Sequence, residues 1–254
     1  MGLRSKKHFQ HDTFQPTIEY VHLLAEADVS ALPTLVCQVA GSVEDTLGTR
    51  PIYTTAWGAL FGGDCLDILP AVAPSSIDSV FADPPFNIGK DYGDSVNDRM
   101  AAHEYLTWCE RWIDECIRVL KDGGSFFLYN IPKWNIYLAN VLLERGMHFR
   151  DWIVIDIKLG LPIPGRLYPS HYSLLYFTKG KPKTFRNIRT PIKQCRHCGG
   201  DVKDYGGHRS ALNPNGLNLT DVWNDIPPVR HWKLSQRNAR RMLCLLNYSN
   251  ASSK

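Results

Sequence analysis

The chain has 254 residues, of which 44% are hydrophobic and 21% charged, and its mean hydropathy is −0.25. This composition is typical of a globular protein with a substantial core, and it excludes disordered, collagen-like and membrane-embedded chains. The net charge of +4 hides an asymmetry, because residues 1–157 carry 12 Lys and Arg against 21 Asp and Glu, and residues 158–254 carry 17 against 4. A basic half of this kind indicates either contact with a polyanion such as nucleic acid or a solvated basic face.

Neither a secretory signal nor a disulfide framework is predicted. The basic start MGLRSKKHFQHD leads into polar residues, and no apolar run is long enough to span a membrane. The cysteines are odd in number, 7 in all, which argues against systematic pairing. We therefore expect reduced thiols, a cytoplasmic location and no membrane contact.

Strand and helix patterns alternate through the middle of the chain. After an N-terminal extension over residues 1–50, an apolar strand runs over 77–81 and ends at a double proline. Helices are predicted over 105–120, ended by Lys121 and the pair Gly123-Gly124, and over 134–145. Strands are predicted over 125–131, 151–159 and from 171. This alternation predicts an α/β core over residues 51–183, with a parallel sheet and helices on its faces.

The alternation stops near residue 184. Residues 184–230 are rich in Gly, Asn, Pro and Arg and show little period, so we expect an irregular insertion outside the main sheet. Residues 231–254 form a separate tail.

Asp83-Pro84-Pro85-Phe86 stands at the end of the first core strand, where open α/β sheets place their ligands. The Asp83 carboxylate and the Pro84 carbonyl could each accept one N–H of an exocyclic amine and hold its nitrogen in line with a methyl donor. The two prolines would stiffen this turn, and Phe86 would stack on a base flipped out of its duplex. The alternative is an acidic turn in which Phe86 only fills the core.

These residues resemble the catalytic motif of the amino-methylating DNA methyltransferases, which produce N6-methyladenine or N4-methylcytosine. Further segments share the likeness: Gly63-Asp64-Cys65 with its following Leu-Asp-Ile-Leu, Leu120 to Gly124, and Asp221-Val222-Trp223. The resemblance covers residues 63–231 and implies a Rossmann-like sheet with the permuted motif order of the β class. It implies that Asp83, Pro84, Pro85 and Phe86 form the target-amine site, and that Asp64 and Cys65 lie near the adenine of S-adenosyl-L-methionine.

The resemblance implies a site-specific methyltransferase of a restriction-modification system, acting on double-stranded DNA. Asp before the prolines favours adenine N6, with cytosine N4 as the alternative. RNA-base and protein-glutamine methylation are further alternatives, which the basic insertion disfavours. A DNA-binding remnant without activity is a second class of function.

One family feature is missing from the printed sequence. The cofactor loop Phe-x-Gly-x-Gly is expected after Asp221-Val222-Trp223, yet the chain continues as WKLSQRNARRMLCLLNYSNASSK. A permitted codon string for residues 241–254 encodes a Pro-led amphipathic sequence in another frame. We therefore expect a frameshifted, truncated product of doubtful activity, with one sheet edge left unpaired.

Cys195 and Cys198 have the C-x-x-C spacing of a zinc site, with a metal-free turn as the alternative. Closure would need His208, His231, another group or a second copy of the chain in a homodimer. Around this pair we expect a basic, DNA-contacting region. Its cations are Lys179, Lys181, Lys183, Arg186, Arg189, Lys193, Arg196, Lys203 and Arg209.

Overall fold

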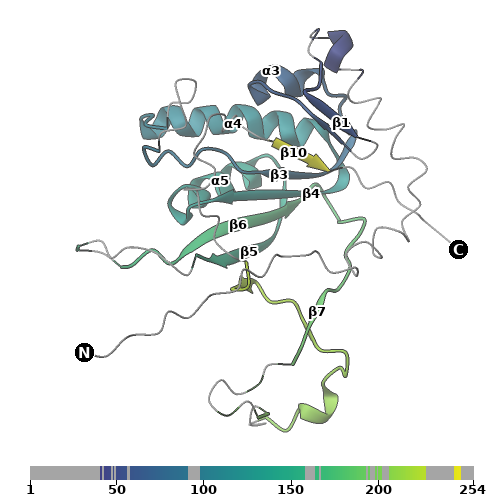
Figure 1. Ribbon diagram of the computed structural model, residues 1–254, viewed down its shortest axis with the longest axis vertical. Coiled ribbons are helices and arrows are strands. Elements are labelled where there is room, and N and C mark those ends of the chain that lie inside the picture. Colours follow the sequence, from purple (N-terminus) through teal and green to yellow (C-terminus); the bar gives the residue numbers. More distant parts are fainter. Residues whose placement is uncertain are drawn as a thin grey trace, which may run out of the picture.

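The computed structural model describes residues 41, 43–46, 48, 50–55, 58–90, 98–157, 164–165, 167–192, 194, 198, 200–201, 206–226 and 243–246. Within these ranges a mixed sheet of 6 strands forms the centre of the molecule (Figure 1). Its strands are β3 (Ile77–Ala82), β4 (Leu120–Asn130), β5 (His148–Asp156), β6 (His171–Thr178), β9 (Val222–Trp223) and β10 (Leu243–Leu246). Their spatial order is β10-β3-β4-β6-β5-β9.

The expected α/β class is confirmed, but the sheet is not purely parallel. β3 pairs parallel with β4, whereas β6 lies between β4 and β5 and is antiparallel to both. Every residue of β6 from Ser173 to Thr178 is buried. A strand buried on both faces is stable in the middle of a sheet, and its insertion separates the two predicted neighbours.

Helices α4 (Ala102–Val119) and α5 (Pro132–Glu144) cover one face of this sheet (Figure 1). The apolar stripe of α4, which includes Tyr105 and Trp112, packs into one core cluster with Leu138 of α5 and the sheet residues Phe126 and Leu175. A smaller cluster joins Ile153, Ile155, Leu174 and Tyr176. The periodicity therefore predicted both helices correctly, because each buries one face.

The expected role of Gly123 and Gly124 is wrong. Helix α4 ends at Val119, and both glycines lie inside β4, where the pairing with β3 shifts between Ile77 and Ser79. Gly123 has a φ of 77°, and a Cβ on Gly124 would meet the Asp78 carbonyl oxygen at 2.9 Å. The two glycines permit an irregular and crowded start of β4. A Gly pair is also common at the end of a helix, so the sequence alone does not distinguish the two.

Both edges of the sheet are occupied by short strands from the C-terminal half. β10 pairs antiparallel with β3, so the edge that we expected to be unpaired is covered. β9 pairs parallel with β5, and the backbone carbonyl of Asp221 accepts a hydrogen bond of 2.7 Å from the backbone N–H of Val154. The segment 184–230 thus does not lie wholly outside the main sheet, as its weak periodicity predicted.

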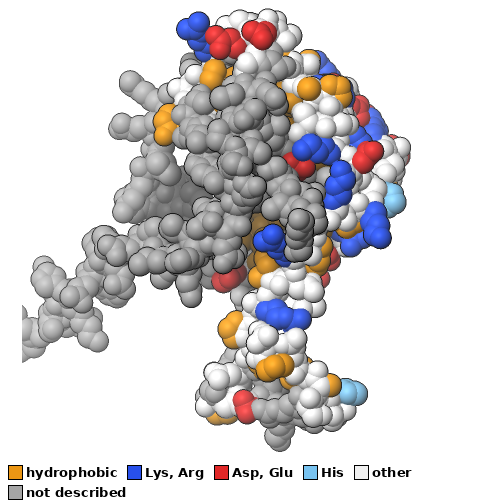
Figure 2. Space-filling model, turned by 90° about the vertical axis from the view of Figure 1, so that its right-hand side faces the viewer, with side chains coloured by type: hydrophobic (Ala, Val, Ile, Leu, Met, Phe, Trp, Pro, Cys, Tyr) orange, Lys and Arg blue, Asp and Glu red, His pale blue; other side chains and the backbone are white. Residues whose placement is uncertain are grey.

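Smaller elements surround the sheet. β1 (Tyr53–Thr55) and β2 (Gly58–Leu60) form a hairpin, followed by α3 (Cys65–Ile68) and the 3-10 turn η2 (Leu69–Ala71). β7 (Arg189–Thr190) pairs with β8 (Leu217–Asn218), and η3 spans Arg209–Ala211. The segment that contains β7 extends away from the sheet as a narrow arm (Figures 1 and 2). Among the described residues, no helix combines the length and apolarity needed to cross a membrane.

Candidate active site

The turn Asp83–Phe86 follows the carboxyl end of β3, an inner strand of the sheet. Ala82 is buried as the last residue of the strand, whereas Asp83 is exposed and the two prolines are half-buried. Proline has no backbone N–H, so the chain cannot continue the sheet ladder here. The structure therefore places the predicted carboxylate on an accessible strand end, next to the ends of β4 and β6.

A buried tyrosine holds the middle of this turn. The hydroxyl of Tyr105, a residue of α4 that is 2% exposed, donates a hydrogen bond of 2.7 Å to the carbonyl of Pro85. The same hydroxyl accepts 2.9 Å from the side-chain amide of Asn130, the last residue of β4. Because Asn130 also accepts from the backbone of Ile131, helix α4 connects the ends of β3 and β4 through one satisfied polar chain.

A buried tryptophan holds the end of the turn. The indole N–H of Trp134, near the start of α5, donates 2.6 Å to the carbonyl of Phe86. Trp134 also packs on the ring of Tyr105, with centroids 4.8 Å apart. Its neighbour Asn135 donates to the carbonyl and the hydroxyl of Ser173 in β6. The two helices thus each supply one donor to the turn and anchor it to the sheet.

The Phe86 side chain is part of an aromatic cluster. It is 7% exposed, and its ring lies 5.7 Å from Tyr129 and 5.4 Å from Tyr172, centroid to centroid. Tyr129 and Tyr172 also contact each other edge-on at 5.4 Å. In this conformation Phe86 fills the space between strand ends, so base stacking on its ring stays a prediction that needs the cluster to open.

The electrostatic setting raises the proton affinity of Asp83. Although the residue is exposed, protein atoms crowd its carboxyl group, and this desolvation raises its pKa from 3.8 to about 6, with a smaller opposing effect of Lys90. The pKa of Tyr129 is also raised, chiefly by burial and further by Tyr172 and the charge of Asp83. Asp83 and Tyr129 are therefore electrostatic neighbours, and a carboxylate of this kind can accept a proton near neutral pH.

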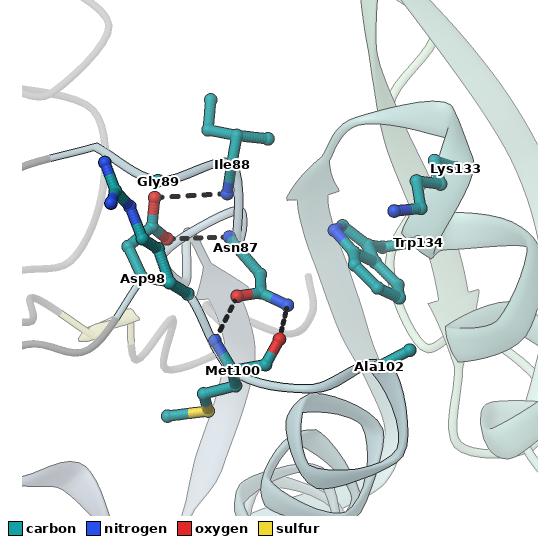
Figure 3. A pocket seen from close by; sticks show the side chains of 9 residues that line it. Asn87, Ile88, Gly89, Asp98, Met100, Ala102, Lys133 and Trp134 are labelled. Carbon is teal, nitrogen blue, oxygen red and sulfur yellow. Dashed lines mark hydrogen bonds between the residues drawn. The ribbon is translucent and has the colours of Figure 1, made fainter.

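The residues after Phe86 form a loop that is closed by Asp98. Its carboxylate, 3% exposed, accepts from the backbone N–H groups of Asn87 (2.7 Å), Ile88 (3.1 Å) and Lys90 (2.7 Å). The side chain of Asn87 in turn bonds the carbonyl and the N–H of Met100 (Figure 3). These contacts hold Asn87 at a φ of 53°, which an asparagine tolerates better than most side chains do.

A cavity of about 410 Å³ opens beside this loop. Its walls are Asn87, Ile88, Gly89, Asp98, Arg99, Met100, Ala102, Lys133 and Trp134. Figure 3 shows Lys133 and Trp134 of α5 facing the loop residues across the space. Trp134 lines the cavity and also donates to the Phe86 carbonyl of the turn, so the cavity adjoins the turn.

The predicted cofactor residues are structural at least in part. Asp64 is the N-cap of α3, and its carboxylate accepts 3.0 Å from the backbone of Leu66. Cys65 is half-buried. It contributes to the raised pKa values of Cys109 and Cys116, so the three thiols are electrostatic neighbours. Burial is the larger cause and raises the pKa of Cys109 to about 12, so this thiol has little nucleophilic character. A contact of Asp64 or Cys65 with a cofactor stays a prediction.

The zinc prediction remains without support from the described residues. Cys195 lies outside them, and Cys198 is exposed. Within the part of the chain that the structure describes, no group of three or more His, Cys, Asp or Glu side chains could hold a metal ion.

The predicted basic region is only partly available for an anion. Lys179 donates 2.9 Å each to the carbonyls of Ile117 and Leu120, so it caps the end of α4. Arg189 donates 2.9 Å to the carbonyl of Gly216 and holds the arm together. Lys181, Lys183 and Arg186 are exposed, and the first two lie beside Gly123 at the entry of β4. Lys193, Arg196, Lys203 and the side chain of Arg209 lie outside the described residues.

Several residues of this site were not predicted from the sequence. The helical pattern predicts Tyr105 and Trp134 only as the first residues of the helices over 105–120 and 134–145. Asn130, at the end of an otherwise apolar strand, was a readable signal because a buried asparagine needs partners. Asp98 gave no local signal, since its partners are backbone groups 8 to 11 residues earlier.

The family model for DNA methylases that transfer to N6 or N4 matches residues 77–247. The chain belongs to this N6/N4 DNA methylase family. The match includes the turn Asp83–Phe86, both core helices and β10.

Individual relatives agree with this membership. The type II methyltransferase M.BamHI of Bacillus amyloliquefaciens is 54% identical over 183 residues, which are 72% of this chain and 43% of that protein. M.HpaI of Haemophilus parainfluenzae is 32% identical over 169 residues, 65% of this chain and 49% of that protein. The chain thus spans less than half the length of both.

Among solved structures, the PvuII DNA methyltransferase (cytosine-N4-specific) matches 54% of each chain, with 24% identity and a TM-score of 0.45.

Proposed function

We propose that this member of the family is a DNA amino-methyltransferase component that binds the exocyclic amine of a flipped base at Asp83. The observation that carries the proposal is the turn Asp83–Phe86, whose later carbonyls are held by Tyr105 and Trp134. Because Pro85 and Phe86 already accept hydrogen bonds, the acceptors left for an amine are those predicted, the Asp83 carboxylate and the Pro84 carbonyl. No hydrogen bond to the Pro84 carbonyl is found within the described part of the chain.

The chemistry then follows from the two acceptors. Each takes one N–H of the target amine, which localises the nitrogen lone pair and directs it at the methyl donor. Attack leaves a positive nitrogen, and Asp83 can accept the proton that this nitrogen releases. With a pKa of about 6, the carboxyl group is mostly ionised at neutral pH and ready for this role.

S-adenosyl-L-methionine is the methyl donor that we propose, because the family resemblance implies it. It would supply an electrophilic methyl group. Asp64 and Cys65, at the start of α3, are the residues of this chain that we propose lie near its adenine.

Adenine N6 is the target that we favour, on the Asp that precedes the prolines. The relatives do not decide the base, because the family model covers both N6 and N4. Double-stranded DNA as partner is part of the same proposal. Zinc at Cys195 and Cys198 and a homodimer stay predictions from the sequence, which metal analysis and sedimentation of the purified chain would test.

The test is methyl transfer by the full 254-residue chain. Labelled S-adenosyl-L-methionine and unmethylated genomic DNA are incubated with the wild type, Asp83→Ala and the control Asp122→Ala, an exposed acid in β4. Nucleoside analysis by mass spectrometry should show N6-methyladenine with the wild type and the control only. N4-methylcytosine would correct the base.

Calorimetric titration with S-adenosyl-L-methionine distinguishes the proposed methyltransferase from an inactive DNA-binding remnant. DNA binding without cofactor binding or transfer would overturn the proposal in favour of a DNA-holding remnant.

A further inference from the structure

Two buried side chains donate to consecutive carbonyls of the turn Asp83–Phe86. The hydroxyl of Tyr105 donates 2.7 Å to Pro85, and the indole N–H of Trp134 donates 2.6 Å to Phe86. Both donor residues are 2% exposed. The proposed chemistry uses neither group, because its two acceptors are the Asp83 carboxylate and the Pro84 carbonyl. Any influence of the two donors on the reaction must therefore pass through the backbone of the turn.

The carbonyls of Pro84 and Pro85 are coupled through a single residue. Their relative direction depends on the two backbone torsions of Pro85, φ and ψ. The pyrrolidine ring fixes φ at about −65°. The bond from Tyr105 fixes the direction of the Pro85 carbonyl and, with it, ψ. Pro84 itself precedes a proline, which restricts its own ψ to the extended region. Tyr105 thus determines the direction of the Pro84 carbonyl although it donates to the next carbonyl along the chain.

The bond from Trp134 acts one residue further along. Phe86 has no ring that fixes its φ, so its peptide group could otherwise rotate and pull on the peptide group of Pro85. The hydrogen bond to the Phe86 carbonyl opposes this rotation. Its effect on the Pro84 carbonyl is less direct than that of Tyr105, because a freely rotating torsion lies between them.

Both donors are themselves fixed to the sheet. The hydroxyl of Tyr105 accepts 2.9 Å from Asn130, the last residue of β4, and its ring packs on that of Trp134 with centroids 4.8 Å apart. Asn135, the neighbour of Trp134 on α5, donates to Ser173 of β6. A donor that is fixed in this way can hold a carbonyl in one direction, whereas a mobile side chain would follow the carbonyl.

We propose that Tyr105 and Trp134 are positioning residues for methyl transfer, which direct the Pro84 carbonyl at one N–H of the target amine. This inference rests on the proposed function. A carbonyl that turns away leaves that N–H without an acceptor, so the nitrogen is no longer held in line with the methyl donor. The loss should affect the rate of transfer and not the affinity for DNA, because most contacts that a protein makes with a duplex go to its phosphates and sugars.

Single-turnover methyl transfer by the full chain tests the inference, with labelled S-adenosyl-L-methionine and unmethylated genomic DNA. Tyr105→Phe and Trp134→Phe each remove one donor and keep an aromatic ring. We expect the rate to fall by about 10- to 100-fold in Tyr105→Phe and by less in Trp134→Phe. The affinity for DNA, measured by filter binding, should stay at the wild-type value. All rates are compared at a temperature at which circular dichroism shows every variant to be folded.

Trp152→Phe is the matched control. Trp152 is half-buried and packs against the same core cluster, but it lies on β5, which β4 and β6 separate from β3. The control loses the same atoms as Trp134→Phe and should keep the wild-type rate.

Two further measurements separate positioning from a change in protonation and from general loosening. The rate of each variant should still fall by half near pH 6, because the surroundings of the Asp83 carboxyl group are unchanged. Burial raises the pKa of Tyr105 above its ordinary value, so its hydroxyl stays a donor throughout this titration. The double variant of Tyr105 and Trp134 should lose less than the product of the two single losses, because both donors hold one turn.

The possible failures are distinguishable. Wild-type rates in folded Tyr105→Phe and Trp134→Phe would overturn the inference and leave the proposed function standing. A fall in rate that weaker DNA binding explains, or a half-maximal rate displaced from pH 6, would overturn it as well, because the two residues would then act on affinity or on the protonation of Asp83. Absence of transfer by the wild type would overturn both the proposed function and this inference.

Discussion

The hydroxyl of Tyr105 and the carbonyl of Pro85 are 2.7 Å apart, although 20 residues separate them in the chain. This hydrogen bond connects the core helix α4 to the turn that carries Asp83. Its geometry means that the direction of the turn depends on the packing of α4 as well as on the stiffness of its prolines. The candidate site is therefore an extension of the core.

Tyr105→Phe should destabilise the fold without leaving a cavity. It removes the donor to the carbonyl of half-buried Pro85 and the acceptor for the amide of fully buried Asn130. We expect a loss of about 1–3 kcal/mol in the free energy of unfolding, measured with urea. Tyr137→Phe, on the exposed side of α5, is the control and should change stability by less than about 0.5 kcal/mol. Equal effects of the two substitutions would contradict this role.

Asp98→Asn should loosen the loop that follows the turn Asp83–Phe86. An amide keeps one acceptor oxygen and turns its NH2 group toward backbone N–H donors, so the three bonds to Asn87, Ile88 and Lys90 cannot all form. We expect a loss of about 2–3 kcal/mol and faster hydrogen exchange at residues 87–90. Asp122→Asn, at an exposed position, should show neither change. Unaltered exchange at 87–90 would show that the loop does not depend on Asp98.

The pH dependence of stability should reveal the environment of Asp83. Its pKa is about 6 when folded and near 3.8 in the unfolded chain, so ionisation costs more in the folded state. Wild-type stability should therefore decrease, relative to Asp83→Asn, as the pH rises from about 4 to about 6, and the gap should stay constant above that. Melting temperatures of both proteins between pH 4 and 8 measure it. A wild-type stability that instead rises relative to Asp83→Asn between pH 4 and 6 would mean that the pKa is lowered.

The same pKa predicts the pH profile of methyl transfer. In the proposed reaction Asp83 must be ionised, so the rate of transfer should fall by half near pH 6 on the acid side. This profile is measured under single-turnover conditions. A rate that is constant down to pH 4.5 would exclude proton acceptance by Asp83.

Gly124→Ala should destabilise the entry of β4 more than Gly146→Ala affects the turn after α5. A Cβ at position 124 would approach the carbonyl oxygens of Asp78 and Lys121 at 2.9 and 2.8 Å, and backbone atoms cannot move aside cheaply. At Gly146 nothing lies within 4 Å, so only its positive φ opposes alanine. We expect about 2–3 kcal/mol for position 124 and about 1 kcal/mol for position 146, by urea unfolding. The reverse order would mean that the β4 entry relaxes freely.

Local patterns in the sequence determined the elements that form the site. The double proline after an apolar strand placed Asp83 at a strand end, and helical periodicity located α4 and α5, because each element buries one face. Family membership was equally readable from short motifs such as Asp83-Pro84-Pro85-Phe86. These features are local, and local chemistry is what a sequence displays directly.

The tertiary structure alone decided which distant residues meet. The sequence around Tyr105 and Trp134 does not predict that each donates to a carbonyl of the same turn. The sequence around Asp98 does not predict its three backbone partners. The insertion of β6 between β4 and β5 likewise depends on the burial of both its faces. Such contacts depend on how whole elements pack, and packing is a property of the assembled core that no short stretch of chain contains.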